Sequence, residues 1–244
     1  RGMEAQSEKD AIRRVVWSLM EDKGIAKFPK PVFGRIPNFA GAEQAASMLF
    51  EEMEYREAKV IKVNPDAPQR RVRLRVLLDG KTLLMPSPRL RCGFLILDPS
   101  RIRRELCGEA SAIGGAFRYG RPCSLRELPQ VDLIVAGSVA VSVDGVRVGK
   151  GGGYSELEYA VLREIGAAAE ETPIFTTVHD VQVVGRVPQE PHDLTVDAII
   201  TPTRVVRVER SLRRPEGIFW EKIAPKQLRE IPILRELKAV SSGS

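Results

Sequence analysis

Short apolar segments alternate with helical ones in the second half of the chain, and this alternation limits the possible folds more than any other feature. The run "VDLIVAG" (131–137) is short and almost continuously apolar, as expected of a central strand covered on both faces. A helix is expected over 156–169, followed by strands in "TPIFTTVHD" (172–180) and "LTVDAIITPTRVV" (194–206). Strands that alternate with helices in this way predict an α/β fold with a layered sheet.

The first half of the chain predicts two helices and a pair of strands. Residues 7–21 carry apolar side chains at helical spacing, with Ser7 as the start signal, and a second helix is expected around 41–57. The segment "RRVRLRVLL" (70–78) alternates arginine with apolar residues, which is typical of a strand with one solvated face. We expect the dipeptide Asp79-Gly80 to join it to a strand in "KTLLMP".

The length of 244 residues and the 43% hydrophobic content allow one sizeable core. We expect a single domain over 7–240 with a helical extension at about 211–240, and flexible ends at 1–6 and 241–244. The apolar runs are shorter than the roughly 20 residues that span a bilayer, and the first residues lack the apolar core of a secretory signal. These features favour a cytoplasmic protein. The three cysteines lack Cys-x-x-Cys spacing, which indicates reduced thiols and no zinc site.

The charge pattern suggests anionic partners only weakly. The formal net charge is +6, but 38 basic residues are nearly balanced by 32 acidic ones. Three arginine-rich stretches, at 70–75, 101–104 and 207–214, are candidates for RNA binding. RNA is not the favoured partner, because no run of aromatic residues lies between these arginines to stack bases.

A glycine cluster stands directly before the helix predicted near 156. In "GKGGGYSELEYAVLREIG" (149–166), Ser155 and Glu158 form a Ser-x-x-Glu capping box that would start this helix at Glu156. Two interpretations of the glycines remain open at this point. They form either a flexible turn, or a cradle whose backbone N–H groups bind phosphate beside Arg147 and Lys150. The cradle would be neither a P-loop, since the lysine precedes the glycines, nor a Rossmann site, since the third glycine is missing.

Three motifs are similar to those of the 5-formyltetrahydrofolate cyclo-ligase family, also called methenyltetrahydrofolate synthetases. The segment "DLIVAGSVAVSVDGVRVGKGGGY" (132–154) resembles the family pattern of an apolar strand, a short excursion and Gly-x-Arg-x-Gly-x-Gly-x-Gly-Tyr-Tyr-Asp. The segment "VPQEPHDLTVDAII" (187–200) resembles its Pro-x-Glu-x-His-Asp ending, and Lys9-x-x-x-Arg13 lies in the expected place. The closest resemblance is to the branch of methenyltetrahydrofolate synthetase domain-containing proteins. It rests on "RIPNF" (35–39), "PSPRLR" (86–91), "GSVAVS" (137–142), "LEYA" (157–160), "TPTRV" (201–205) and "IPIL" (231–234).

This resemblance implies a three-layer α/β/α sandwich of the NagB/RpiA-like, cyclo-ligase-like class, with a mostly parallel central sheet. It also implies an ATP- and Mg²⁺-dependent ligase. In that reaction the formyl oxygen of 5-formyltetrahydrofolate takes the γ-phosphoryl group, N10 closes on the activated carbon, and phosphate leaves to give 5,10-methenyltetrahydrofolate. A related pterin is a possible substrate. The alternative is an inactive family member that binds nucleotide or RNA.

The family's site residues carry over to this chain position by position. The resemblance implies that ATP is bound by Lys9, Arg13, Arg147, Gly149, Lys150, Gly151, Gly152, Gly153 and Tyr154. Among these, Arg147, Lys150 and Tyr154 would act in catalysis. Glu156 and Asp193 would hold Mg²⁺, and His192 would be structural. From the residues alone, Lys9 and Arg13 would instead form a solvated helix face.

The chain departs from the family pattern at several positions. Ser155 replaces the second tyrosine, Glu156 replaces the metal-binding aspartate, and Gly152 replaces a basic residue. The acidic segment that grips the pterin has no clear counterpart, because "IPNFAGAE" (36–43) offers only Glu43, out of register. The resemblance therefore supports ATP binding more strongly than folate binding.

Overall fold

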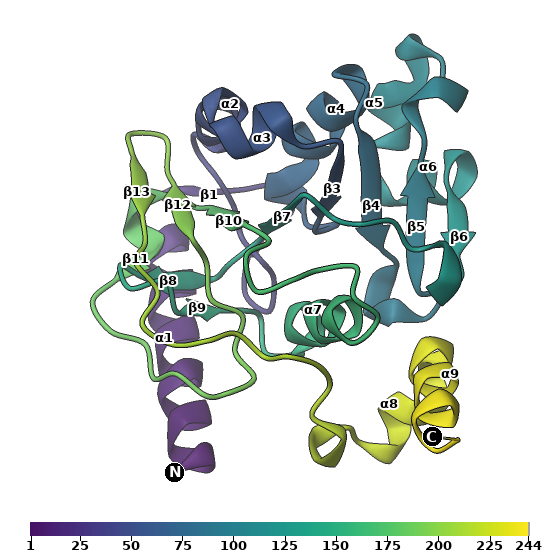
Figure 1. Cartoon of the computed structure of the whole chain (residues 1–244). Helices are drawn as coiled ribbons and strands as arrows, with labels where there is room; N and C mark the ends of the chain where they lie inside the picture. The colour runs from purple at the N-terminus through teal and green to yellow at the C-terminus, as the bar shows by residue number, and fades with distance from the viewer. Residues whose placement is uncertain (244) are drawn as a thin grey trace.

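The computed structural model describes residues 1–243, and an eight-stranded mixed sheet forms its centre (Figure 1). The five middle strands, from β12 to β4, are parallel, and the outer strands β13, β5 and β6 run antiparallel to their neighbours. In spatial order the strands are β13 (Val205–Arg207), β12 (Ala198–Ile200), β10 (Ile174–Thr177), β7 (Leu133–Ala136), β3 (Val60–Val63), β4 (Thr82–Pro86), β5 (Phe94–Leu97) and β6 (Arg121–Cys123). Two small sheets are added, β11 (Val183–Val184), β8 (Ala140–Ser142) and β9 (Arg147–Val148), and β1 (Ala26–Lys27) with β2 (Asn38–Phe39).

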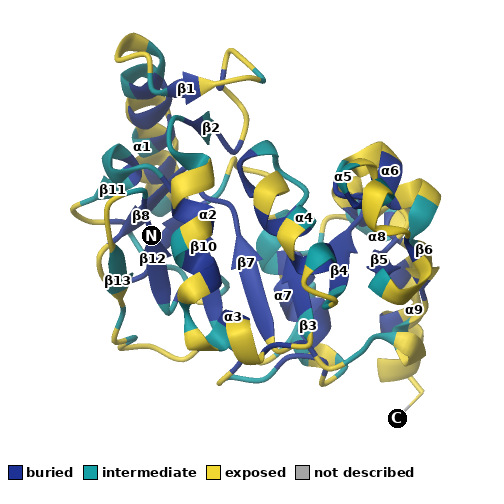
Figure 2. Ribbon diagram, turned by 90° about the horizontal axis from the view of Figure 1, so that it is seen from above, coloured by how far each residue is buried: buried dark blue, intermediate teal, exposed yellow. Residues whose placement is uncertain are grey.

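Helices cover both faces of the central sheet, which confirms the predicted α/β/α layering (Figures 1 and 2). One face carries α2 (Ala42–Glu51), α3 (Met53–Glu57) and α4 (Arg70–Leu78), and the other carries α7 (Tyr154–Glu164) with α8 (Pro225–Glu230) and α9 (Pro232–Ser241). The remaining helices are α1 (Gly2–Asp22), α5 (Cys107–Ala110) and α6 (Ile113–Tyr119), and a 3-10 turn, η2 (Pro88–Leu90), follows β4.

The sheet separates two apolar cores. Along β4, Leu83 and Met85 pack in the core that also holds α2 and α4, whereas Leu84 packs in the core that also holds α7 and α9. Successive side chains of a strand point to opposite faces, so a strand buried on both faces must be apolar throughout. This explains why the run at 131–137 was recognisable as a central strand, and β7 confirms that prediction.

The predicted strand at 70–78 is wrong, because this segment forms helix α4. Its buried residues Val72, Val76 and Leu77 are spaced to lie on one helical face toward the core. Arg73 is also buried, and its guanidinium donates to the carbonyl oxygens of residues 64, 66 and 111. The alternating arginines predicted a strand with one solvated face. The same residues also fit the spacing of a helix, and only tertiary packing distinguishes a strand from a helix here.

Other boundaries differ from the predictions in smaller ways. The first helix begins at Gly2 and not at Ser7, and the second is interrupted at Glu52, where an extended residue separates α2 from α3. The segment 194–206 contains two antiparallel strands, β12 and β13. The strand at 172–180 is confirmed as β10, and near the C-terminus the chain forms the short helices α8 and α9.

The remaining predictions concern the thiols, the chain end and membrane segments. The three cysteines are free thiols. Of the end predicted to be flexible, residue 244 lies outside the described residues. Among the helices of residues 1–243, none has the length and apolar character needed to cross a membrane.

The Glu170 carboxylate binds the segment that leads to the C-terminal helices. It accepts hydrogen bonds from the side chains of Arg163 and Arg210 and from the backbone N–H of Arg214. Burial acts to raise the pKa of Glu170, but these hydrogen bonds outweigh it and hold the pKa below its usual 4.5.

The low pKa of Glu170 predicts a loss of stability in acid. As the pH falls below about 4.5, the unfolded chain takes up the proton first, so this contribution disappears as the pH approaches the folded-state pKa. We expect Glu170→Gln to lower the free energy of unfolding by about 1 kcal/mol at neutral pH and to have a smaller effect near pH 3. Urea unfolding over a pH series measures both. A difference in the free energy of unfolding between Glu170→Gln and the wild type that is equal at all pH values would contradict the prediction.

Candidate functional site

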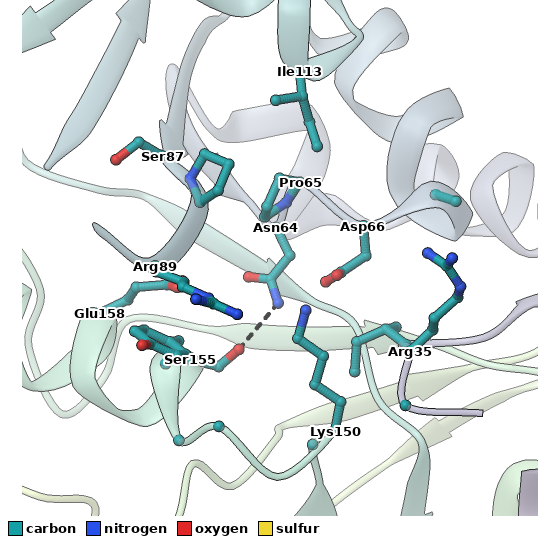
Figure 3. Close-up of a pocket in the computed structure, with 18 of the residues that line it drawn as sticks. Arg35, Asn64, Pro65, Asp66, Ser87, Arg89, Ile113, Lys150, Ser155 and Glu158 are labelled. Atoms are coloured by element: carbon teal, nitrogen blue, oxygen red, sulfur yellow. Dashed lines mark hydrogen bonds between the residues drawn. The ribbon is translucent and has the colours of Figure 1, made fainter. Parts of the chain in front are cut away.

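A cavity of about 860 Å³ opens at the carboxyl ends of β3 and β4. From β3 the chain continues to the neighbouring strand β4 in one direction across the sheet, and from β7 it continues to β10 and β12 in the opposite direction. The strands β3 and β7 therefore flank a topological switch point, which is the position where open α/β sheets bind ligands. Residues just after β3 and β4, among them Asp66 and Ser87, line the cavity together with the loop that carries Lys150 (Figure 3). The polar and charged lining residues are Arg35, Asn64, Asp66, Arg70, Arg73, Ser87, Arg89, Arg147, Lys150, Tyr154, Ser155, Glu156 and Glu158.

The glycine cluster runs directly into α7, which starts at Tyr154 and not at Glu156. Gly153 is the N-cap residue in a left-handed conformation, with φ of 68°, which glycine adopts without steric cost. The predicted capping box is wrong. Ser155 accepts a hydrogen bond from Asn64 instead, and Glu158 binds Lys62, because both side chains face the polar floor of the cavity.

Arg147 is buried beneath the glycine cluster. Its guanidinium donates to the carbonyl oxygen of Gly137, at the end of β7, over 2.7 Å, and forms an ion pair with Glu156 at 2.8 Å. Only 2% of Arg147 is exposed. The side chain therefore joins the end of a central strand to the first turn of α7 and places positive charge under the loop.

Lys9 and Arg13 lie behind the loop and not on a solvated face. They are 3% and 7% exposed, so the interpretation as a surface pair is wrong. The Arg13 Nε donates to the carbonyl oxygen of Gly149 at 2.7 Å, and its guanidinium lies close to Gly151. Helix α1 thus holds the loop through Arg13, which does not line the cavity.

The second predicted motif forms an acidic cluster around Lys9. The Lys9 Nζ lies 2.8 Å from both carboxylate oxygens of Asp193 and 2.9 Å from Glu190. Burial raises the pKa of Asp193, and Lys9 opposes that shift. Among the histidine, cysteine, aspartate and glutamate side chains of residues 1–243, one group is spaced to hold a metal ion, namely Glu190, His192 and Asp193. In this structure the ammonium of Lys9 supplies the positive charge next to Glu190 and Asp193.

Removing the ammonium should destabilise this cluster. Lys9→Met leaves two largely buried carboxylates without their cation, so we expect the free energy of unfolding to fall by about 2 kcal/mol. Glu8→Gln is the matched control, because Glu8 is exposed on the same helix. Urea unfolding measures the difference, and equal stability of both variants would contradict it.

The predicted site residues divide into two groups. Seven of them line the cavity, namely Arg147, Gly149, Lys150, Gly152, Gly153, Tyr154 and Glu156. Lys9, Arg13, Gly151 and Asp193 are not in the lining and support the loop or its surroundings.

Sequence reasoning missed Asp66, which follows β3 at the cavity floor. Burial raises the pKa of this carboxyl, while Lys150, Arg73 and Arg147 act against the shift. The expected acidic segment was sought at 36–43, but Glu43 lies on α2 and lines a separate cavity of about 490 Å³. The available signal was the polar stretch "NPDAPQ" (64–69) directly after the apolar "VIKV", which is β3.

Comparison with known proteins places the chain in a family. The model of the 5-formyltetrahydrofolate cyclo-ligase family matches residues 5–202. The chain belongs to this family. Among curated cyclo-ligase relatives, the methenyltetrahydrofolate synthase domain-containing protein of Mus musculus is 46% identical over 243 residues, which cover 97% of this chain and 65% of the relative. The protein of that name from Homo sapiens is 44% identical over 236 residues, covering 95% and 61%.

The cyclo-ligase fold is also shared with a solved structure. The NMR structure of Aquifex aeolicus 5,10-methenyltetrahydrofolate synthetase has a TM-score of 0.53 and 20% identity, and the match covers 84% of this chain and 95% of that one. The chain spans less than two thirds of the length of the two relatives above. The resemblance to the cyclo-ligase family that the sequence motifs predicted is confirmed.

Proposed function

We propose that this chain is an ATP- and Mg²⁺-dependent ligase that converts 5-formyltetrahydrofolate, or a related pterin, to 5,10-methenyltetrahydrofolate. The observation that carries the proposal is the cavity at the β3/β7 switch point, which joins a glycine loop, basic side chains and the half-buried carboxyl of Asp66. The reaction has two substrates, a nucleotide and a pterin, and the cavity offers groups suited to each.

The nucleotide phosphates would lie on the glycine loop. Backbone N–H groups at the start of α7 favour an anion, and Lys150 extends into the same space (Figure 3). Across residues 1–243 the Lys150 ammonium has no hydrogen-bond or ion-pair partner, and its charge acts on Asp66. Phosphoryl transfer requires mainly positioning and neutralisation of charge, which Lys150 and the anchored Arg147 would supply.

Glu156 is the carboxylate best placed to hold Mg²⁺. One of its oxygens is bonded to Arg147, the other accepts no hydrogen bond from the described residues, and the side chain lines the cavity. A single protein carboxylate is sufficient, because Mg²⁺ takes its other ligands from phosphates and water. The bound ion would neutralise charge on the phosphates. Asp193, the second predicted ligand, is engaged by Lys9 and would have to exchange that partner to join.

Asp66 would receive the pterin. The pterin ring presents neighbouring N–H donors, and a carboxylate accepts two of them with a fixed orientation. Asp66 lies at the floor of the cavity with Asn64 beside it, which would place the formyl group between this floor and the loop.

The test is a direct assay of turnover with a parallel binding measurement. The protein is mixed with Mg²⁺-ATP and 5-formyltetrahydrofolate, and the near-ultraviolet absorbance of methenyltetrahydrofolate is followed. We expect ATP-dependent product, and Asp66→Asn should lower the rate at least about 100-fold if it orients the pterin. Binding of ATP without product would favour the inactive, nucleotide-binding alternative, and failure to bind ATP or folate would overturn the proposal.

The RNA version of that alternative is weakened in one of the three arginine-rich stretches, where ion pairs neutralise three of the four arginines. In the stretch 207–214, Arg207 pairs with Glu52 and Glu54, while Arg210 and Arg214 pair with Asp197. Salt-dependent binding of single-stranded RNA would be the observation that supports it.

A further inference from the structure

The turn after β4 holds an arginine in an unusual conformation at the cavity wall. Within η2, Arg89 and Leu90 both have positive φ, at 54° and 53°. Non-glycine residues rarely adopt this region, and two in succession persist only when their surroundings hold them there. Leu90 is fully buried in the core beneath α7, and the Ser87 hydroxyl closes the turn by donating to the carbonyl oxygen of Gly93 at 2.6 Å.

This turn presents Arg89 to the cavity without a protein partner. Its side chain lines the cavity (Figure 3), and within residues 1–243 it makes no ion pair or hydrogen bond. Arg91, two residues later, is exposed and does not line the cavity. Of the two arginines in the "PSPRLR" motif, Arg89 therefore lines the cavity and Arg91 does not.

A chain of buried hydrogen bonds orients a second donor, Ser155, in the same cavity. The Lys62 ammonium can only donate, so Asn64 must turn its Oδ1 toward it, at 3.0 Å. The amide N–H of Asn64 then donates to the Ser155 Oγ, at 3.2 Å. Asn64 is 2% exposed and cannot turn over without losing the bond to Lys62. The Ser155 oxygen therefore acts as acceptor toward the protein, and its own hydrogen bonds to no acceptor in residues 1–243.

We propose that Arg89 and Ser155 form an oxyanion subsite, separate from the glycine loop, that binds a carboxylate or phosphate group of a substrate. A guanidinium offers two parallel N–H donors that match two oxygens of either group, and the serine hydroxyl adds a third. The identity of the ligand rests on the proposed function. The anion is either the glutamyl carboxylate at the tail of a folate or a phosphate of the nucleotide.

Calorimetric titration with three probes tests this subsite and identifies its anion. The probes are ATP, 5-formyltetrahydrofolate, and a 5-formyltetrahydropterin that lacks the aminobenzoylglutamate tail. We expect Arg89→Gln to weaken binding of the anion-bearing probe about 10- to 100-fold and Ser155→Ala to weaken it about 5-fold. Arg91→Gln, the matched control in the same segment, should change each affinity less than about 2-fold.

The change in affinity for each of the three probes identifies the anion that the subsite binds. A loss confined to 5-formyltetrahydrofolate, with the tailless pterin unaffected, assigns a carboxylate, and a loss confined to ATP assigns a phosphate. If the wild-type chain binds these ligands and Arg89→Gln binds them equally well, the subsite is overturned while the proposed function stands. If the wild-type chain binds none of them, both fail.

A second variant separates ligand binding from a structural role. Glycine adopts the left-handed backbone of residue 89 without a steric penalty, so Arg89→Gly should melt at or above the wild-type temperature while losing as much affinity as Arg89→Gln. A lower melting temperature with unchanged affinity would show that Arg89 supports the turn only.

Discussion

Replacing Arg147 with alanine should abolish turnover, weaken ATP binding at least about 100-fold and lower the free energy of unfolding by about 3–5 kcal/mol. The guanidinium is buried, and its removal leaves both the Gly137 carbonyl oxygen and the Glu156 carboxylate without their donor. The first turn of α7 would then lose its link to the end of β7, and the glycine loop would lose the charge beneath it. Urea unfolding and calorimetric titration with ATP measure the two effects.

Two further variants make the Arg147 experiment specific. Arg186→Ala removes an exposed arginine that has no partner in residues 1–243, and it should leave both quantities unchanged. Glu156→Gln keeps Arg147 bonded to Gly137, so it should fold nearly as well as the wild type while losing affinity for Mg²⁺-ATP. The prediction is contradicted if Arg147→Ala remains within about 0.5 kcal/mol of the wild type and still binds ATP.

The buried ion pair between Lys62 and Glu158 should have the second large effect. The Lys62 Nζ lies 2.6 Å from the Glu158 carboxylate, between β3 and α7, and both side chains are almost fully buried. Lys62→Met leaves the carboxylate without its cation, so we expect a loss of about 3–5 kcal/mol in the free energy of unfolding. The double variant Lys62→Met/Glu158→Leu should recover most of this loss, because it removes the unpaired charge as well.

The pH dependence of the Lys62→Met variant follows from Glu158. Burial raises the pKa of Glu158, and Lys62 opposes this in the wild type. Without Lys62 the folded state keeps its proton at pH values where the unfolded chain has released it. Stability must therefore fall as the pH rises above about 4.5, the ordinary glutamate value. Unfolding measured between about pH 5 and 8 should show a growing deficit in Lys62→Met and none in the double variant. A deficit independent of pH would contradict this account.

The same pair links stability to the proposed oxyanion subsite. Lys62 also donates to Asn64, which orients Ser155. The double variant should therefore be stable and yet bind the anion-bearing probe less tightly, as Ser155→Ala does. Recovered stability with full affinity would show that Asn64 orients Ser155 without help from Lys62.

Local patterns were sufficient for elements whose burial can be read from neighbouring residues. The apolar run at 131–137 predicted β7, because a central strand needs apolar side chains on both faces. The glycine cluster before α7 was also recognisable, since positive φ and tight turns select glycine. The motifs at 132–154 and 187–200 predicted the cyclo-ligase family, and the match of the family model confirms it.

Sequence patterns led to wrong predictions where a polar side chain is buried. The segment 70–78 was predicted as a strand because its arginines were taken to be solvated, whereas Arg73 reaches three carbonyl oxygens inside the protein. The Ser155/Glu158 capping box failed for the same reason, since both side chains bind the polar floor of the cavity. From the residues alone Lys9 was expected on a solvated face, but it is buried and bonded to Asp193 and Glu190 across more than 180 residues of sequence.

The layered α/β fold, the family and the position of the glycine loop could all be predicted from the amino-acid order, because each depends on residues that lie close together in the chain. Which charged groups meet is a property of the tertiary structure. It placed Asp66 and Arg89 in one cavity with Lys150, and it set Lys9 against Asp193 behind the loop. The strength of an ionic or hydrogen-bonded contact depends on distance, burial and the available partners, and a linear pattern contains none of these quantities.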